Sequence, residues 1–313
     1  MSQPESAIAD AQAGGPKNGT PDKGQEPLAK LAERYGLRRA IARPSLPVYL
    51  RQLWERRHFV MTYATSRNVS KYSNSALGQL WQVLTPLLNA GIYYLMFGLI
   101  LGAKGTIHNY TAFLITGMFV FTYTQRSVSG GAKSISSNLS LIRALHFPRA
   151  ALPFAYTIQE FQQLLISMAV LLVLVPLTGE PITWMWLLVP VALLLQTMFN
   201  IGTSMALARV GATARDLNQL LPFIMRTWLY ASGVFFSIQD RIVANTHLPQ
   251  WVADLMYFNP AAAHMELMRD LLIKSHPTPN QSWIWSVCVF WAVFALIGGF
   301  WYFWRAEEKY GRG

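Results

Sequence analysis

Glu160 and Arg226 are the charged residues that stand inside long apolar runs of this 313-residue sequence. A charge near the middle of a bilayer costs on the order of 3 kcal/mol, so such residues usually face protein or water. On helices, the depths of the two residues, each counted from the predicted cytoplasmic end of its run, would differ by only about 5 Å. We predict that they face the protein interior and pair with each other or with a partner subunit; the alternative is that each extends its head group to the membrane surface. Because Gln159, Gln162 and Gln163 surround Glu160, this stretch is expected to pack on protein or to face water.

Aromatic and hydroxyl side chains recur at helical spacing in two of the apolar runs. Tyr93 and Phe97 form one such pair, and Phe223, Thr227 and Tyr230 form a second stripe. Side chains spaced by three or four residues share a helix face, and such a stripe most often packs against a neighbouring helix. The second interpretation is a pathway lining, because aromatic rings offer flat apolar faces to sugars and tyrosine adds a hydroxyl.

Catalytic motifs and metal-binding patterns are missing from the sequence. It holds no G-x-x-x-x-G-K-[ST] loop, no H-E-x-x-H and no G-x-S-x-G, so ATP hydrolysis, zinc-peptidase and hydrolase chemistry have no support. The six histidines are scattered, and the single cysteine, Cys288, lies in an apolar run as a small packing residue. We therefore expect a chain that is not an enzyme and that has no catalytic residue, metal or cofactor of its own.

The composition is that of an all-α integral membrane protein. Hydrophobic residues make up 52% and charged residues 13%, the latter about half the share found in soluble domains. Six transmembrane helices are predicted, at about 79–103, 110–131, 152–176, 182–208, 217–238 and 283–304. Basic residues flanking these runs explain the formal net charge of +11, so nucleic-acid binding is not expected.

Lysine and arginine residues near the span ends set the predicted orientation. Twelve precede the first span, and more lie in the loops after spans 2 and 4 and in the C-terminal tail. The loops after spans 1 and 3 hold only Lys104. By the positive-inside rule both termini face the cytoplasm, which makes the loop at 134–153 cytoplasmic and the segment at 239–282 extracytoplasmic.

The N-terminal region divides into a tail and an amphipathic helix. Residues 1–40 are rich in small, charged and proline residues and predict a disordered, basic cytoplasmic tail. Within 41–72, an apolar arc opposite polar residues predicts a helix at about 47–66 that lies in the membrane interface. Arg51, Trp54, Arg56 and Arg57 would then meet lipid headgroups or a pyrophosphate, although ordinary anchoring by basic residues explains them equally well.

The loop between spans 2 and 3 has the pattern of a short amphipathic helix. Leu139, Ile142 and Leu145 are its apolar residues, and Arg143 and His146 are polar neighbours. Such a loop can be a simple connector or a docking surface for a cytoplasmic partner. We predict the docking role, with the three apolar side chains forming the buried face and Arg143 at its rim.

The segment between spans 5 and 6 holds two short helix-like stretches on either side of Asn259 and Pro260. Each is too short to cross a bilayer. We predict an extracytoplasmic re-entrant helical hairpin that is buried in protein or lines a cavity. Residues 73–308 form the six-span domain in this scheme, and 309–313 form a short cytoplasmic tail.

Four stretches together resemble one family. They are LWQVLTPLLNAGIYYLMFGLIL at 80–101, SNLSLIRALHFPRAALP at 137–153, RDLNQLLPFIMRTWLYASGVFFSI at 215–238 and LPQWVADLMYFNPAAAHMELMRDLL at 248–272. The pattern is similar to the membrane (permease) subunit of ABC-2-type exporters that move lipid-linked polysaccharides such as O-antigen, teichoic acid or galactan. Within that family the sequence resembles actinobacterial galactan exporters.

The resemblance implies a homodimer in the bacterial inner membrane, joined by two copies of a separate ATPase that binds ATP and Mg²⁺. The helix at 47–66 corresponds to the family's interface or gate helix, the loop at 134–147 to its coupling helix, and 248–272 to its extracytoplasmic hairpin. No catalytic residue is implied in this subunit, whose two-state channel is driven by the partner's ATP cycle.

Two other functions share some of these features. An ABC-2 exporter of drugs or small lipids has the same architecture. An integral-membrane glycosyltransferase that uses a polyprenyl-phosphate donor is the second alternative. Such enzymes usually carry acidic residues in the first extracytoplasmic loop, and residues 104–109 include none.

Overall fold

The computed structural model describes residues 44–310, apart from positions 74, 101–106, 146, 215, 240–248, 277 and 279 and the side chains at 79, 93, 97, 99, 250 and 309. Contacts group the chain from Arg43 onward into one compact unit. All regular structure in the described residues is helical, which confirms the all-α class for this part of the chain. The predicted tail at 1–40 lies outside the described residues.

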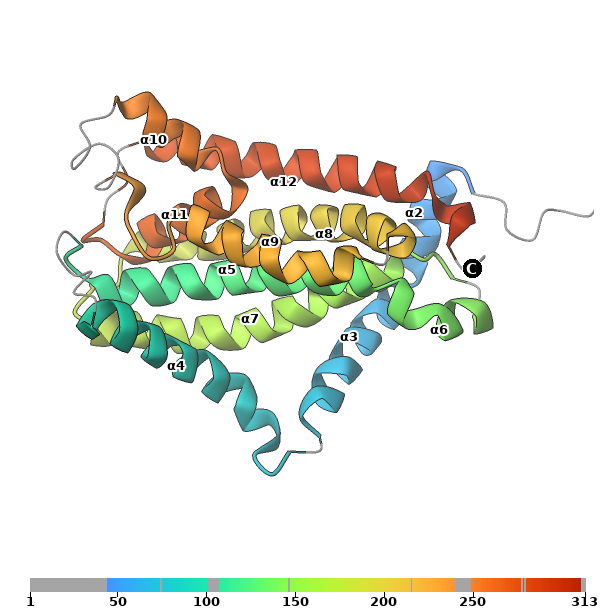
Figure 1. Ribbon diagram of the computed structural model, residues 1–313, viewed down its shortest axis with the longest axis horizontal. Helices are drawn as coiled ribbons and strands as arrows, with labels where there is room; N and C mark the ends of the chain where they lie inside the picture. Colours follow the sequence, from blue (N-terminus) through green and yellow to red (C-terminus); the bar gives the residue numbers. More distant parts are fainter. Residues whose placement is uncertain are drawn as a thin grey trace, which may run out of the picture. The chain divides into compact units, whose positions relative to one another are not determined.

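Four long helices run side by side (Figure 1): α5 (Tyr110–Lys133), α7 (Ala151–Leu177), α8 (Val189–Thr213) and α12 (Gln281–Trp304). Three stretches, Ala151–Leu177, Trp184–Thr213 and Gln281–Trp304, are long and apolar enough to cross a membrane. The 24-residue α5 has similar length but is buried among α7, α8, α9 and α11. The chain therefore carries membrane-spanning helices, and the count of six stays a prediction.

Close contact between α8 and α12 depends on glycines that face each other. A Cβ atom on Gly202 would lie 2.0 Å from the carbonyl oxygen of Ala295, and one on Gly299 would lie 2.0 Å from the carbonyl oxygen of Gly202. No side chain fits in that space. Small residues let helix backbones approach each other in membranes, where dispersion contacts drive association.

Shorter helices complete the unit: α4 (Trp81–Tyr93), continued by a π-helical stretch at Tyr94–Ile100, then α9 (Leu217–Ala231), α10 (Gln250–Tyr257) and α11 (Pro260–Leu272). The α9 helix ends well before residue 238, where the predicted span ends, because the chain turns at Gly233 with a φ of 69°. Two short helices do follow where the hairpin is predicted, and α11 is buried against α5, α8 and α12. Its re-entrant placement in a membrane stays a prediction.

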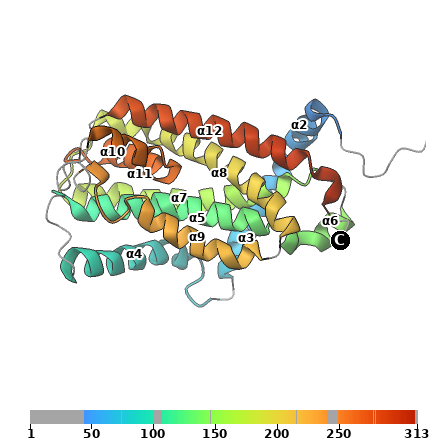
Figure 2. The same cartoon turned by 45° about the horizontal axis from the view of Figure 1, so that its top comes forward.

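The predicted single helix at 47–66 is in fact two, α2 (Leu46–Glu55) and α3 (Arg57–Tyr72), with a turn at Arg56. The reason is that each half packs on a different surface. Tyr49 of α2 is buried near the end of α12, whereas α3 lies against α7. Figures 1 and 2 show α2 and α6 (Leu139–Ala144) at one end of the long helices and α10 at the other. These are named the α6 end and the α10 end below.

Candidate functional site

Polar side chains join α7 to α3. The Nε of Arg67 donates to Gln159 Oε1 at 2.9 Å, and Asn68 Nδ2 donates to Gln162 Oε1 at 2.8 Å. In return, Gln162 Nε2 donates to Thr65 Oγ1 at 3.0 Å. The expectation that this polar part of α7 packs on protein is confirmed. The glutamines bind α3, which supplies partners that lipid would not.

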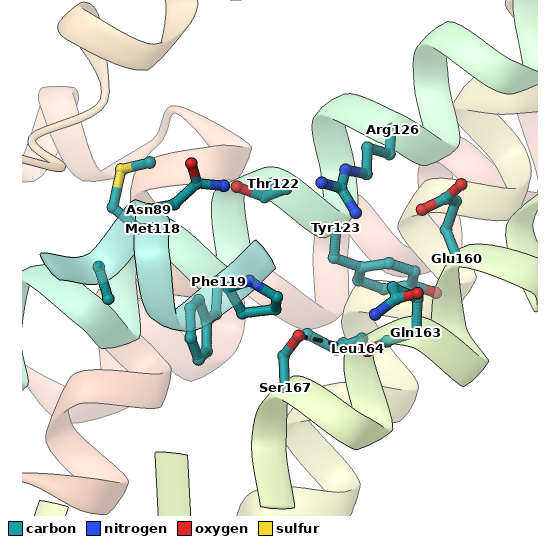
Figure 3. Close-up of a pocket in the computed structure, with 12 residues that line it drawn as sticks. Asn89, Met118, Phe119, Thr122, Tyr123, Arg126, Glu160, Gln163, Leu164 and Ser167 are labelled. Atoms are coloured by element: carbon teal, nitrogen blue, oxygen red, sulfur yellow. Dashed lines mark hydrogen bonds between the residues drawn. The ribbon is translucent and has the colours of Figure 1, made fainter. Parts of the chain in front are cut away.

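Glu160 lies on the same part of α7 but lines a pocket between α4, α5 and α7, which it shares with Arg126 of α5 (Figure 3). Arg226 is exposed on α9. No ion pair among the described residues includes either Glu160 or Arg226. A single subunit therefore does not join the two charges. Pairing of Arg226 with a second subunit stays a prediction.

The stripe on α9 faces outward. Thr227 is exposed, and Phe223 and Tyr230 are 69% and 56% exposed, while Leu221 and Met225 on the opposite side of the helix are buried. The stripe thus does not serve helix packing within this subunit and is open to lipid, to a second subunit or to a substrate. The side chains of Tyr93 and Phe97, the other predicted lining pair, lie outside the described residues.

The basic residues of the interface region face away from the long helices. Arg51 forms an exposed ion pair with Glu55 at 3.1 Å, and Arg56 is exposed at the turn between α2 and α3. Arg57 donates to the carbonyl oxygen of Trp54 at 3.2 Å and lies over its indole ring at 5.4 Å. Their outward placement suits contact with headgroups, and that contact stays a prediction.

The loop between α5 and α7 contains the six-residue helix α6. Ile142 is buried and packs in a cluster that includes Tyr49 and Ile135, whereas Leu139 and Leu145 are 36% and 51% exposed. Within this subunit the three apolar residues therefore do not share one buried face, because the helix ends at Ala144 and Leu145 takes an extended conformation. Burial of Leu139 and Leu145 by a partner stays a prediction.

Arg143 and His146 are the other two residues of this loop that were predicted to take part in docking. Arg143 is exposed. His146 lies outside the described residues. Ile142 therefore holds α6 to the rest of the subunit, and the side chains of Leu139 and Leu145 are exposed.

Tyr49, Arg149 and Glu307 form a buried cluster at the α6 end. Glu307, in the short helix η7 (Glu307–Lys309), accepts from the Tyr49 hydroxyl at 2.8 Å and from the Arg149 backbone N–H at 3.0 Å. The Tyr49 hydroxyl accepts from the Ala150 N–H at 3.1 Å. Burial raises the pKa of the Glu307 carboxyl above its usual value, although both hydrogen bonds act to lower it. The cluster ties α2 to the start of α7 and to the chain after α12.

A buried charge at the α10 end is the feature that sequence reasoning missed. Arg269 of α11 is 2% exposed and donates to the carbonyl oxygens of Phe113, Gly233 and Val234 at 3.2, 3.0 and 2.9 Å. It pairs with Glu266 at 3.3 Å, and the other carboxylate oxygen lies 2.9 Å from His276 Nε2. The sequence did show Glu266 and Arg269 at i, i+3 spacing, which places them on the same face of a helix.

The described residues contain no group of three or more His, Cys, Asp or Glu side chains that could hold a metal ion. What the structure offers is hydrogen-bonded helix contacts, an outward aromatic stripe and an exposed short helix.

Comparison with known proteins agrees with this architecture. Residues 60–273 match the ABC-2 type transporter family. An O-antigen export system permease protein RfbA of Myxococcus xanthus is 29% identical over 61% of this chain and 74% of its own length. Proteins of the same name from Klebsiella pneumoniae are 28% and 26% identical, over 73% and 65% of this chain and 84% and 76% of their own lengths.

The match to the family covers more than half of the sequence, from within α3 to the end of α11. With its all-helical architecture and membrane-spanning helices, the chain is a multi-pass membrane protein that belongs to the ABC-2 type transporter family.

Proposed function

We propose that this chain is the transmembrane subunit of an ATP-driven exporter that moves a lipid-linked polysaccharide, of O-antigen or galactan type, out of the cytoplasm across the bacterial inner membrane. The family match supports a transporter subunit, and the relatives named O-antigen export permeases support a polysaccharide cargo. Since the sequence has no P-loop, the energy comes from a separate ATPase, present in two copies, that binds ATP and Mg²⁺.

The observation that carries the coupling is the position of α6. It lies at one end of the subunit, where Leu139 and Leu145 are exposed. The buried side chain of Ile142 packs against the rest of the subunit and holds the helix in place. Apolar side chains held outward on an anchored helix suit insertion into a pocket of another protein. We infer that the α6 end is cytoplasmic, in agreement with the basic residues of the neighbouring loops.

A homodimer is the second part of the proposal. The outward stripe on α9 combines Phe223 and Tyr230 with the hydroxyl of Thr227. Two subunits that bring such stripes together would enclose a path with aromatic faces and hydroxyl groups, which suits sugar rings. At the membrane surface, Arg51, Arg56 and Arg57 supply positive charge for an anionic lipid carrier, worth about 1 kcal/mol each.

The test is co-expression of the full chain with each ABC ATPase subunit that the same genome encodes without a transmembrane domain. We expect one such ATPase to purify with this chain, and depletion of this chain to leave polymer inside the cell. Leu145→Asp should weaken the association because it places a charge in an apolar contact. Normal export from cells in which no such ATPase associates with this chain would contradict the proposal. Export of a small lipid or drug with unchanged polymer would assign the chain to the other ABC-2 class.

A further inference from the structure

The pocket between α4, α5 and α7 contains charges that the proposed transport mechanism does not use. Arg126 and Glu160 lie at one side of it, close to Thr122 of α5, and Asn89 of α4 lines the same space (Figure 3). Arg126 and Glu160 form no hydrogen bond or ion pair with another described residue. Two unpaired opposite charges within helices that contact lipid are costly, so a ligand that binds them gains stability.

The depth of the pocket indicates what kind of ligand can reach it. Arg126 is seven residues from the end of α5, and Glu160 is nine residues from the start of α7. At 1.5 Å per residue they lie about 10 and 14 Å from the α6 end. Since each headgroup region is about 5–8 Å thick, this is a few ångströms inside the hydrocarbon core, within reach of a headgroup drawn in from the α6 end.

The pocket opens to the surface of the subunit at its polar side, where Asn89 is exposed and Arg126 and Glu160 are partly exposed. Leu87, Leu88 and Ile92 of α4 are exposed on other faces of that helix, so the surface around α4 is apolar. The opposite part of the lining is apolar and includes Phe119 and Leu164. A molecule with a polar head and an acyl or prenyl chain matches both parts, because its head meets the charges while its chain stays in lipid.

We propose that this pocket binds the phosphate-bearing head of a lipid, with the Arg126 guanidinium on the phosphate oxygens. Guanidinium groups bind phosphate through paired, charge-assisted hydrogen bonds. Asn89 accepts hydrogen bonds from hydroxyl or amine groups of the same head. The lipid is either a bilayer phospholipid or a polyprenyl-phosphate carrier, since both present this chemistry at this depth. The site is separate from α6 and from the α9 stripe, so it stands whether or not the chain exports a polysaccharide.

The experiment measures ligand binding to the full purified chain in neutral detergent. The probes are farnesyl phosphate, farnesol, short-chain phosphatidylglycerol and inorganic phosphate. We expect at least one phosphorylated lipid to bind at least tenfold more tightly than both farnesol and inorganic phosphate. Preference for farnesyl phosphate identifies the carrier lipid, and preference for phosphatidylglycerol identifies a bilayer lipid. Equal binding of farnesol or of inorganic phosphate overturns the proposal.

Charge variants make the test specific to these residues. Arg126→Gln should weaken binding of the phosphorylated lipid at least tenfold, and Lys133→Gln, at the exposed end of the same helix, should change it less than twofold. Glu160→Gln should tighten binding severalfold, because the carboxylate repels the phosphate. Damage to the fold cannot produce a gain in affinity, so this second variant remains informative if Arg126→Gln is unstable. Weakening by both variants, or by neither, would show that phosphate does not bind at Arg126.

Discussion

The hydroxyl of Tyr49 donates a 2.8 Å hydrogen bond to the carboxylate of Glu307, which lies 258 positions further along the chain. The same hydroxyl accepts from the N–H of Ala150, directly after Arg149 in the segment that follows α6. One buried oxygen atom therefore connects the first described helix, the segment behind the proposed docking helix and the end of the chain. Ile142 of α6 belongs to the same buried cluster as Tyr49, so α6 and α2 are joined through this site.

Tyr49→Phe removes that oxygen and leaves the Ala150 N–H and a Glu307 oxygen unpaired in a buried site. We expect the free energy of unfolding to fall by about 1–3 kcal/mol, the usual penalty for leaving buried polar groups without partners. Thermal unfolding of the purified chain in detergent measures the change. Tyr230→Phe is the matched control, because it removes an exposed hydroxyl and should change stability by less than about 0.5 kcal/mol. Equal effects of the two variants would show that the cluster adds no stability.

The two kinds of apolar residue on α6 should respond differently to substitution. Leu145→Asp changes an exposed side chain, so the chain should stay as stable as the parent while association with the ATPase weakens at least tenfold. Ile142→Ala empties a buried site and should lower the free energy of unfolding by about 2–5 kcal/mol. Unfolding curves and co-purification yields separate the two results. If Leu145→Asp leaves the complex intact, α6 is only a connector.

Local pattern predicted the helices but not their long-range contacts. The long apolar runs, charge-free at α8 and α12 and with Glu160 as the single charge at α7, predicted these three helices. A helix that crosses lipid must satisfy its own backbone and expose apolar side chains. The glutamines around Glu160 correctly indicated a protein neighbour, but nothing in α7 identifies α3 as that neighbour. The break at Arg56 and the end of α6 at Ala144 depend on where each half packs, which helical periodicity does not encode.

The candidate site was predicted less completely than the fold, for a related reason. Arg126 was one of several basic residues near a span end, and only the approach of α7 and α4 places it in a pocket with Glu160. Arg269 has its hydrogen-bond partners on α5 and in the turn after α9, so its role follows from tertiary structure alone. Catalytic motifs, by contrast, are local patterns, so their presence can be checked in the sequence itself.

Gly299→Ala tests the contact between α8 and α12. The added Cβ would lie 2.0 Å from the Gly202 carbonyl oxygen, so the two backbones must separate and lose close packing. We expect a loss of about 1–3 kcal/mol in the free energy of unfolding, as for overpacked cores. Gly298→Ala, at the adjacent position, meets no atom within 4 Å and should be neutral or slightly stabilising. Thermal unfolding of both variants gives the comparison, and a larger loss for Gly298→Ala would contradict it.

Glu180, in the turn between α7 and α8, should make stability depend on pH. Burial by itself raises its pKa, but hydrogen bonds from Ser275 and Asn109 outweigh burial and hold the pKa below the usual value. Its contribution is therefore fully present above the unfolded pKa of about 4.3 and is lost as the pH falls through the lower folded value. The stability difference between the parent and Glu180→Gln should be largest near neutral pH and shrink below pH ~4. Unfolding temperatures across this range give the result, and a difference that grows on acidification would be the opposite outcome.

Gly117 and Arg269 should be energetically coupled. A Cβ on Gly117 would lie 2.3 Å from an Arg269 guanidinium nitrogen, so Gly117→Ala must displace the side chain from the carbonyl oxygens of Gly233 and Val234. Because a buried charge that loses its partners is strongly destabilising, we expect a cost of about 3–5 kcal/mol. In an Arg269→Met background the guanidinium is gone and the same alanine should cost less than about 1 kcal/mol. Unfolding measurements on the four proteins of this double-mutant cycle test the coupling. Additive effects would mean that Gly117 is needed for something other than the space that Arg269 occupies.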